Sequence, residues 1–522
     1  MQKVFITLLL IVLNSNILRS QTDHDLINKV VNDFIEGTTY RNADKIRSAF
    51  YPGTKMYLYN DQDSLWEVTS EEYASWYNRN PGVKSDRDGR IVTIDIVLDV
   101  AYAKIAIDIP SFGNRYYDLL LLKKIEGKWK IISKCTSAEP IPKRPEESIA
   151  NPVKKVIIEN LNHPWSMAFI SESDVIIAEK DGDLLKVNLE TKESTKITGI
   201  PLDVGRKILI DTSNHAWGTF PPNSHGQVHS YNAGWFQVLL DPDFIDNKYI
   251  YISYAAENDD RASTTKVVRG RLNGSSLSEL ETILVAAPYS HGLFHYGGGM
   301  IFGPDGKLYI TIGERNLFEH NNPVLPLAQD FSDKRGKVFR INPDGSIPED
   351  NPDFGPQAVK GLYAIGIRAT QGLAVDSNTD EIWFSDHGTI QGDELNILES
   401  GANYGWPHRT SGKYRSEGYN PPIDSNLVFT DPIHSWDQTV APTGLTFYEG
   451  SDFPQWKGNL IVPGLSKGSL WRINIEDQKV IGVEELFIND RVRLRKAVVS
   501  PKGKLYLLTD EENGKLIRIK NG

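Results

Sequence analysis

The sequence predicts a mainly β protein, a six-bladed β-propeller preceded by a small α+β domain. Three observations support this fold class. From about residue 150, short β-rich runs alternate with Asp-Gly and Lys-Gly turns, as in GPDGKLYITIG and GKLYLLTD. Roughly 370 residues of such hairpins contain no helical run of comparable strength, and four strands per blade divide them into about six blades. Before residue 140, apolar residues recur first at helical spacing and then in alternation.

Residues 1–20 have the features of a signal peptide. Lys3 precedes an apolar run over 4–13, which is too short to anchor the chain in a bilayer. The run is followed by no cysteine that could carry a lipid, and no later segment has the length of a membrane helix. We therefore expect an exported protein, periplasmic or secreted, without a membrane span. Cys135 is the single cysteine, so we expect no disulfide and a small buried apolar residue at this position.

Residues 21–138 form the predicted α+β domain. Ile27, Val31 and Phe34 recur at helical spacing, a second helical stretch covers 43–50, and alternating strands follow over 91–134 with a turn at 126–127. The prolines and charges of 139–152 predict a linker, and 153–522 form the propeller. The net charge of -11 argues against nucleic acid as a partner, because phosphate binding needs clustered Lys and Arg.

The segments DGRIVTIDIVLDVAYAKIAI and LLLKKIEGKWKII resemble the nuclear transport factor 2-like, lumazine-binding-like family. The resemblance implies a cone-like α+β fold that often contains an apolar pocket and often dimerises. Three roles remain open for this domain: it could bind a small ligand, form a homodimer, or guide substrate to the propeller.

Six runs in the propeller region resemble the soluble quinoprotein glucose and aldose sugar dehydrogenases, and the resemblance covers almost all of residues 155–520. The resemblance implies an enzyme that holds pyrroloquinoline quinone (PQQ) and calcium, oxidises an aldose at C1 to the lactone, and passes electrons to an external acceptor. In chain order the runs are LNHPWSMAF, HYGGGMIFGPDGKLYITIGE, AQDFSDKRGKVFRINPDGSIPEDNP, GIRATQGLAV, HGTIQGDELNILESGANYGWP and TVAPTGLTFY.

Two residues match the family's catalytic positions. His295 matches the general base that takes the proton of the C1 hydroxyl while hydride passes to the quinone, and a histidine pKa lies near working pH. Arg368 matches the arginine beside the quinone carbonyl, where a permanent cation stabilises developing negative charge. The family's next residue is usually asparagine, whereas this chain has Ala369, so one amide toward the cofactor is missing.

Further matches concern the carboxylates of the cofactor. Arg493 and Arg495 alternate and therefore point to one face of a strand, which suits a polyanion. The family's lysine falls within LSKG, where Ser466 stands at the expected place and Lys467 follows it. Since a shift of one residue reverses the face, Lys467 is a candidate and not an assignment.

The run HGTIQGDE resembles the family's calcium loop. The resemblance implies that the carbonyls of Gly388 and Thr389 bind the calcium ion that polarises the cofactor. Asp393 and Glu394, with the carbonyl of Tyr404, match a second and structural calcium position. The additional acidic ligands of glucose-specific members are not evident after Pro407, so we expect fewer ions.

The sugar side departs from the family. Asn232, a candidate for both cofactor and substrate contact, stands where glutamine is usual, and Phe294 precedes the base where many members have a polar residue. Trp436 is a candidate platform for stacking a sugar, with core packing as its alternative. The sugar preference therefore does not follow from the resemblance.

Two other function classes remain open. The change at Ala369 and the uncertain lysine favour a propeller that has weakened its cofactor binding and acts as a carbohydrate-binding module. A calcium-dependent, lactonase-like hydrolase is the third reading, but the acid and amide ligands that it needs are not visible. Retention of His295, Arg368, Arg493 and Arg495 favours the dehydrogenase.

Overall fold

The computed structural model describes residues 23–60, 64–79, 81–140, 150–206, 208–211, 227–230, 232–292, 294–315, 326–414, 427–466, 468–488 and 490–522. The chain divides into two compact units, Met1–Glu147 and Ser148–Gly522, and the division falls within the predicted linker 139–152. The predicted signal peptide 1–20 lies outside the described residues, and the exact domain bounds stay predictions. Among the helices of the described ranges, none is both long enough and apolar enough to cross a bilayer.

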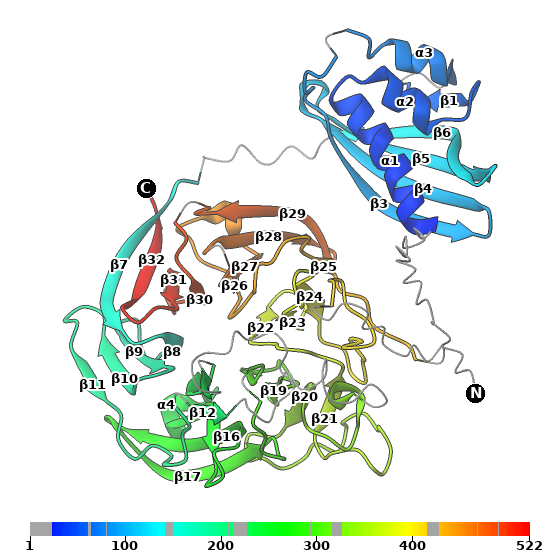
Figure 1. The fold of residues 1–522 in the computed structure, drawn as a ribbon. Helices are drawn as coiled ribbons and strands as arrows, with labels where there is room; N and C mark the ends of the chain where they lie inside the picture. Colours follow the sequence, from blue (N-terminus) through cyan, green and yellow to red (C-terminus); the bar gives the residue numbers. More distant parts are fainter. Residues whose placement is uncertain are drawn as a thin grey trace, which may run out of the picture. The chain divides into compact units, whose positions relative to one another are not determined.

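The first unit packs helices against a six-stranded sheet. The helix α1 (Asp23–Thr39) crosses one face of the sheet, and its residues Ile27, Val31 and Phe34 are fully buried (Figure 1). Two shorter helices follow, α2 (Ala43–Ala49) and α3 (Ser70–Ser75). The strand order is β2-β1-β6-β5-β4-β3. The strands are β1 (Lys55–Leu58), β2 (Trp66–Thr69), β3 (Asp88–Val97), β4 (Val100–Ile109), β5 (Asn114–Ile125) and β6 (Lys128–Pro140).

This unit confirms most of the predicted pattern. Both predicted helices and the turn at Glu126-Gly127 are present, whereas α3 was not predicted. The prediction of a buried Cys135 is wrong, because this cysteine is exposed. Neighbouring residues of a strand face opposite sides, and on β6 it is Lys134 that points inward, with 2% of its surface exposed.

The second unit is mainly β, as predicted. Its described residues form six four-stranded antiparallel sheets and the two-stranded pair β12 (Ile208–Asp211) and β13 (Gln227–Ser230). The first strands of the six sheets are β8 (Pro164–Phe169), β14 (Trp235–Leu240), β18 (Gly297–Phe302), β22 (Gly372–Asp376), β26 (Thr446–Tyr448) and β30 (Leu494–Val499).

The second strands are β9 (Asp174–Glu179), β15 (Tyr249–Glu257), β19 (Leu308–Ile312), β23 (Glu381–Asp386), β27 (Asn459–Pro463) and β31 (Leu505–Thr509). The third are β10 (Leu184–Asn188), β16 (Ser263–Asn273), β20 (Lys337–Ile341), β24 (Glu394–Ile397), β28 (Leu470–Glu476) and β32 (Gly514–Asn521). The outer strands are β11 (Ser194–Lys196), β17 (Ser276–Val285), β21 (Leu362–Ile365), β25 (His434–Ser435), β29 (Lys479–Leu486) and β7 (Pro152–Leu161).

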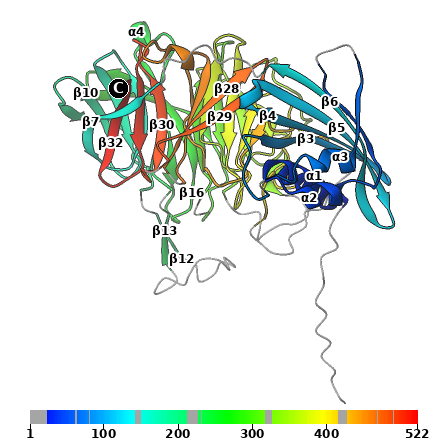
Figure 2. The same ribbon diagram turned by 90° about the horizontal axis from the view of Figure 1, so that it is seen from above.

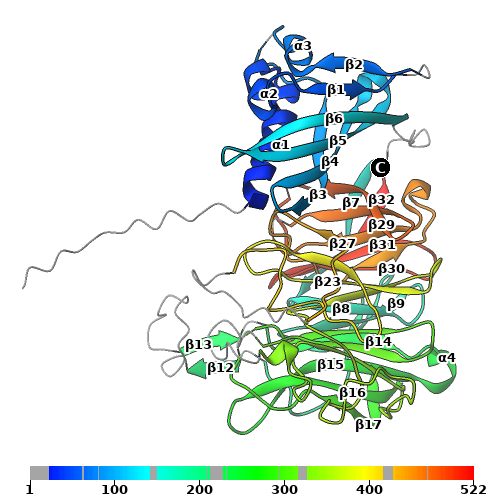
Figure 3. The same ribbon diagram turned by 90° about the vertical axis from the view of Figure 1, so that its right-hand side faces the viewer.

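The sheets follow one another around a ring (Figure 1). Each first strand contacts the first strand of the next sheet, and β30 contacts β8. The ring closes because β7, from the start of the unit, pairs with β32 from its end. Each sheet lies between two neighbours, so strands such as β19 and β31 are buried on both faces and have nearly continuous apolar sequences. Figure 2 and Figure 3 show the pair β12 and β13 projecting from the ring.

Candidate active site

The antiparallel order of the sheets determines where functional side chains gather. In an antiparallel pair, the start of one strand lies beside the end of the next. Residues that precede each first strand therefore meet residues that follow each second strand, at one end of the ring. A cavity of about 360 Å³ lies there. Among the described residues that line it, three have basic side chains, Lys180, Arg493 and Arg495, and none has a carboxylate.

His295 lies on the wall of this cavity and is held by a buried carboxylate. Its Nδ1 contacts Oε1 of Glu314, whose side chain is 1% exposed. The backbone N–H of Glu314 donates to the carbonyl of Arg368 (2.9 Å), which links the histidine to the next sheet. With Nδ1 donating to the carboxylate, the basic nitrogen of the ring is Nε2. The pair with Glu314 also stabilises the imidazolium that proton uptake creates.

A second histidine, His387, lines the same cavity but is less suited to act as a base. Its Nε2 donates to the carbonyl of Pro442 (2.7 Å), and this neutral acceptor stabilises an imidazolium less than the carboxylate that His295 contacts. Burial lowers the pKa of His387, which further disfavours its protonation. His295 therefore remains the better candidate.

The glycines after His295 have a packing role. Gly298 has φ +88°, and a Cβ there would come within 2.7 Å of the ring of Phe236. Gly297 also has positive φ and lines the cavity, whereas Gly299 packs against the neighbouring sheet. His295 itself has φ +53°, a conformation that is uncommon for residues with a side chain and is often found at functional sites.

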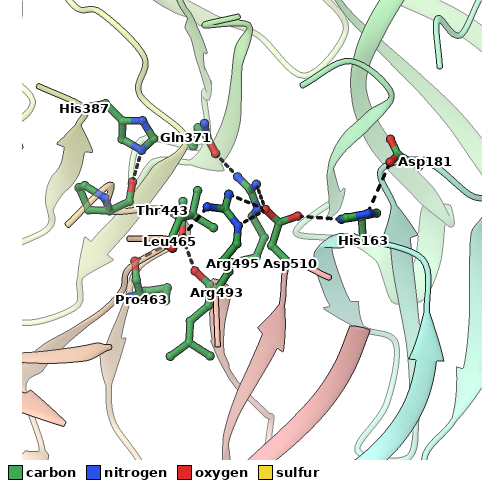
Figure 4. A network of polar contacts seen from close by, with 12 residues as sticks. His163, Asp181, Gln371, His387, Thr443, Pro463, Leu465, Arg493, Arg495 and Asp510 are labelled. Atoms are coloured by element: carbon green, nitrogen blue, oxygen red, sulfur yellow. Dashed lines mark hydrogen bonds and ion pairs between the residues drawn. The ribbon is translucent and has the colours of Figure 1, made fainter. Parts of the chain in front are cut away.

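Figure 4 shows the cationic end of the cavity. Arg493 and Arg495 both reach Oδ2 of Asp510, at 2.9 Å and 2.7 Å, so the two arginines share one face as predicted from their alternation. Arg495 is 3% exposed and also donates to Gln371. His163 lies between Asp510 (3.5 Å) and Asp181 (3.9 Å). The carboxylate of Asp510 therefore holds both arginines in place.

Burial makes these charges costly. Burial lowers the pKa of Lys180 and of Arg495, although the nearby carboxylate of Asp510 opposes it. Burial alone would raise the pKa of Asp510, but Arg495, His163 and Lys180 outweigh it, and the pKa is lowered. An anionic ligand in the cavity would bring negative charge toward Lys180 and the two arginines.

Arg368 lines a second, much smaller cavity of about 10 Å³, which has room for one water or ion. Its Nη1 donates to the carbonyl of Gly388 (2.7 Å), the first predicted calcium ligand. A carbonyl oxygen has two lone pairs, so this bond leaves one acceptor position for a metal ion. Both oxygens of Asp386 accept backbone N–H groups from Arg368 and Ala369, at 2.7 Å and 2.6 Å, and fix this turn. His387 lines both cavities.

The other predicted calcium ligands differ in their surroundings. Asp393 accepts N–H groups from Gly388 (2.8 Å), Val440 (2.6 Å) and Ala441 (2.7 Å). Both of its oxygens therefore help to shape the loop, and Asp393 is not among the described residues that line the small cavity, so its role as a calcium ligand stays a prediction. Thr389 is buried, and its Oγ1 donates to a backbone carbonyl.

Glu394 and Tyr404, by contrast, line the small cavity. Oε1 of Glu394 accepts the hydroxyl of Ser411 (2.7 Å), and burial raises the pKa of Glu394 to about 7. Such a buried carboxylate is the kind of oxygen ligand that a calcium ion stabilises. The donors around this cavity thus fit calcium. Within the described ranges, no group of three or more His, Cys, Asp or Glu side chains is arranged to hold a metal, so backbone carbonyls would complete the ligand set.

Of the remaining predicted residues, some line the large cavity and others do not. Asn232 and Phe294 line the large cavity, beside His295. Trp436 does not line this cavity. It is 3% exposed, and its ring centroid lies 6.2 Å from that of Trp471 in the core between two sheets. The prediction of a sugar platform is therefore wrong, because a stacking ring needs an open face. Lys467 lies outside the described residues.

The sequence interpretation missed Glu314, Lys180, Asp386 and Asp510. All four share one position in the repeat, at or just after the end of a second strand. The runs VIIAEK, YITIGE, IWFSD and YLLTD each place a charged residue directly after an apolar strand. Comparing these strand ends with one another would have found them.

The arrangement supports proton transfer at one wall and anion binding at the other. His295 with Glu314 can accept a proton from a hydroxyl group. Lys180, Arg493 and Arg495 can bind carboxylates, with Gln371 positioned by Arg495. The cavity volume lies within the range of small-molecule sites.

Comparisons with known proteins show that the chain is similar to sugar dehydrogenases. The aldose sugar dehydrogenase YliI of Escherichia coli is 30% identical over 70% of this chain and 92% of its own length. The quinoprotein glucose dehydrogenase B of Acinetobacter calcoaceticus is 27% identical over 68% of this chain and 85% of its own. The crystal structure of the apo E. coli aldose sugar dehydrogenase covers 71% of this chain and 100% of that one, with a TM-score of 0.61 and 29% identity.

A structure of the PQQ-bound aldose sugar dehydrogenase of Streptomyces coelicolor covers 71% of this chain and 98% of that one, with a TM-score of 0.53 and 25% identity. Residues 22–136 match a family model for lumazine-binding-like domains. Residues 161–518, more than half of the chain, match the family model described as glucose/sorbosone dehydrogenase. The protein therefore belongs to the glucose/sorbosone dehydrogenase family of oxidoreductases.

Proposed function

We propose that this protein is a PQQ- and calcium-dependent aldose dehydrogenase that oxidises the C1 hydroxyl of a sugar to the lactone. The six four-stranded sheets act as the blades of a propeller, and the protein works after export, with an external electron acceptor. The observation that carries the proposal is the pairing of His295 with buried Glu314 on the wall of a cavity whose described lining holds three basic side chains and no carboxylate.

The cationic residues suit the three carboxylates of PQQ. Arg495 offers a preorganised planar fork, because Asp510 and Gln371 already hold it. Arg493 and Lys180 add two further cations on the same wall, and Lys467 stays a candidate. When bound, PQQ supplies a quinone carbon that accepts hydride.

The protein's residues perform the rest of the reaction. His295 Nε2 takes the hydroxyl proton as the C1–H bond breaks and the C1–O bond gains double-bond character, and Glu314 stabilises the charge on the imidazole. Arg368 provides a cation next to the metal loop, held there by Asp386 and the Gly388 carbonyl. Asn232 and Phe294 are the residues that we expect to contact the sugar.

A carbohydrate-binding propeller without redox activity is the second candidate. The observation in its favour is Ala369, which is fully buried and offers no amide at the position where the family usually has asparagine. The cationic wall of the cavity argues against it, because a neutral sugar brings no negative charge toward Lys180, Arg493 and Arg495.

Calorimetric titration of the apo-protein with PQQ tests the proposal. We expect binding at micromolar concentration or tighter, dye-linked oxidation of aldoses, and loss of both on chelation. Arg368 and a metal ion would share the Gly388 carbonyl and repel each other, so we also expect calcium affinity to rise when the anionic cofactor is present, with an equal reciprocal effect. Absence of PQQ binding in the presence of calcium would leave the binding-module reading.

The lowered pKa of Lys180 leads to a pH-dependent prediction. In the free protein, burial lowers this pKa, so part of the population is neutral between the lowered value and the ordinary value of about 10.4. A bound carboxylate raises the pKa again, and PQQ binding in this range should therefore take up protons. Calorimetry in buffers with different ionisation enthalpies measures the uptake. Lys180→Met should abolish it, whereas Lys186→Met, on β10 outside the cavity, should not.

A further inference from the structure

The N-terminal domain contains a cavity of its own, which the proposed dehydrogenase function does not use. A space of about 240 Å³ lies between α3 and the inner face of the sheet. A second space of about 200 Å³ shares five of its lining residues. The walls are mostly aromatic and aliphatic, formed by Leu58, Tyr59, Trp66, Tyr73, Trp76, Tyr77, Ile107, Ile109, Phe112 and Tyr116.

The floor of this cavity carries a buried ion pair. On β5, alternate residues face inward, and Asp118 stands in a row whose next two members are Leu120 and Leu122. Its carboxylate pairs with Nζ of Lys134 at 2.7 Å, and both side chains are at most 3% exposed. Thr136 donates its hydroxyl to Asp118 at 2.7 Å. These polar groups satisfy one another, so a ligand would meet little unpaired polarity at the floor.

The side of the cavity is different, because two arginines lie there with buried nitrogen atoms. Nε of Arg41 and Nε of Arg87 are shielded from solvent and have no hydrogen-bond partner among the described residues. Both arginines line the 200 Å³ space, and Arg87 also lines the larger one. Arg87 donates to the hydroxyl of Tyr77 through Nη1. Both guanidinium ions bring their positive charge to the 200 Å³ space, so a carboxylate placed there would be attracted to both of them.

The residues that line the two spaces carry a small net positive charge. The lining includes three cations, Arg41, Arg87 and Lys134, against two carboxylates, Asp86 and Asp118. Asp118 is neutralised by Lys134, and Asp86 is exposed and accepts the backbone N–H of Ser111 at 2.9 Å. One negative charge on a ligand would balance the net positive charge that Arg41 and Arg87 leave after Asp86 is counted.

We propose that this cavity binds a small planar aromatic compound with one carboxylate. The ring lies against Trp76 and Tyr77, where aromatic faces surround it, and the carboxylate pairs with the guanidinium groups of Arg87 and Arg41. A sugar or sugar acid fits less well, because the aliphatic and aromatic walls would leave several hydroxyl groups without partners. The site is independent of the proposed chemistry in the second unit.

Calorimetry on the full-length mature protein, without PQQ, tests this site. The probes are 1-naphthoate, its neutral counterpart 1-naphthalenemethanol, and gluconate. We expect one naphthoate per chain, about 10-fold or more tighter than the alcohol, because the alcohol lacks the charge for the arginine fork. Gluconate should give no binding heat. In Arg87→Gln, the preference for the acid over the alcohol should fall, because only Arg41 remains to pair with the carboxylate.

Two variants make the result interpretable. Arg90→Gln, on β3 and outside both spaces, should keep the preference for the acid. Arg87→Lys keeps the charge without the planar fork and should give an intermediate preference; thermal unfolding identifies any variant that fails to fold. Equal binding of acid and alcohol to the unaltered protein, tighter binding of gluconate, or an unchanged preference in Arg87→Gln would each overturn the proposal. The last result would mean that the acid binds to the cationic wall in the second unit.

Discussion

Replacing His295 with glutamine is expected to lower the turnover of aldose oxidation by about two to four orders of magnitude. Glutamine keeps the size and a hydrogen bond toward Glu314, but it cannot accept the hydroxyl proton. PQQ affinity should change little, since the cationic wall is untouched. Calorimetry for PQQ and single-turnover kinetics for the bound quinone measure the two effects separately.

The matched control is His434→Gln, which changes a histidine of the same unit that lines neither cavity. Its turnover should stay close to that of the unaltered protein. A His295→Gln variant with near-native turnover would mean that another group is the base.

Replacing Arg495 with glutamine should have the opposite profile. We expect PQQ affinity to fall by roughly 30-fold or more, because breaking a buried, hydrogen-bonded charge pair costs about 2–5 kcal/mol. The change also leaves Asp510 with less positive charge around it, so its carboxylate would repel those of the cofactor. At saturating PQQ, the rate of quinone reduction should recover much of its original value.

Arg518→Gln serves as the control for this loss. Arg518 pairs with Asp452 at 3.0 Å on β32 and lines neither cavity. Its PQQ affinity should be unchanged. An Arg495→Gln variant that binds PQQ as tightly as the unaltered protein would place the carboxylates of the cofactor elsewhere.

The sequence predicted the repetitive part of the fold well. Hairpins such as GKLYLLTD combine a turn with an apolar strand, and the structure forms strands in these places. The sequence also located His295, Arg493, Arg495 and Asn232, all of which line one cavity. These residues lie near the starts of first strands, where motif and strand are adjacent in the chain.

The partners of these residues were harder to predict. Glu314 is 19 residues from His295, and Asp510 is 15 residues from Arg495, so each pair forms only when two antiparallel strands bring their ends together. Trp436 shows the reverse difficulty: a tryptophan beside a functional motif can equally fill the core. Cys135 is exposed and its neighbour Lys134 is buried, because an ion pair with Asp118 makes burial of the lysine favourable.

The most direct test of the central claim is single-turnover reduction of bound PQQ by an aldose. Protein loaded with PQQ and calcium is mixed anaerobically with glucose or another aldose, and the absorbance of the quinone is followed. We predict that each bound PQQ is reduced once, with one lactone formed per PQQ, and that His295→Gln slows this step. Tight binding of PQQ without reduction by any aldose tested, or no binding at all, would contradict the account.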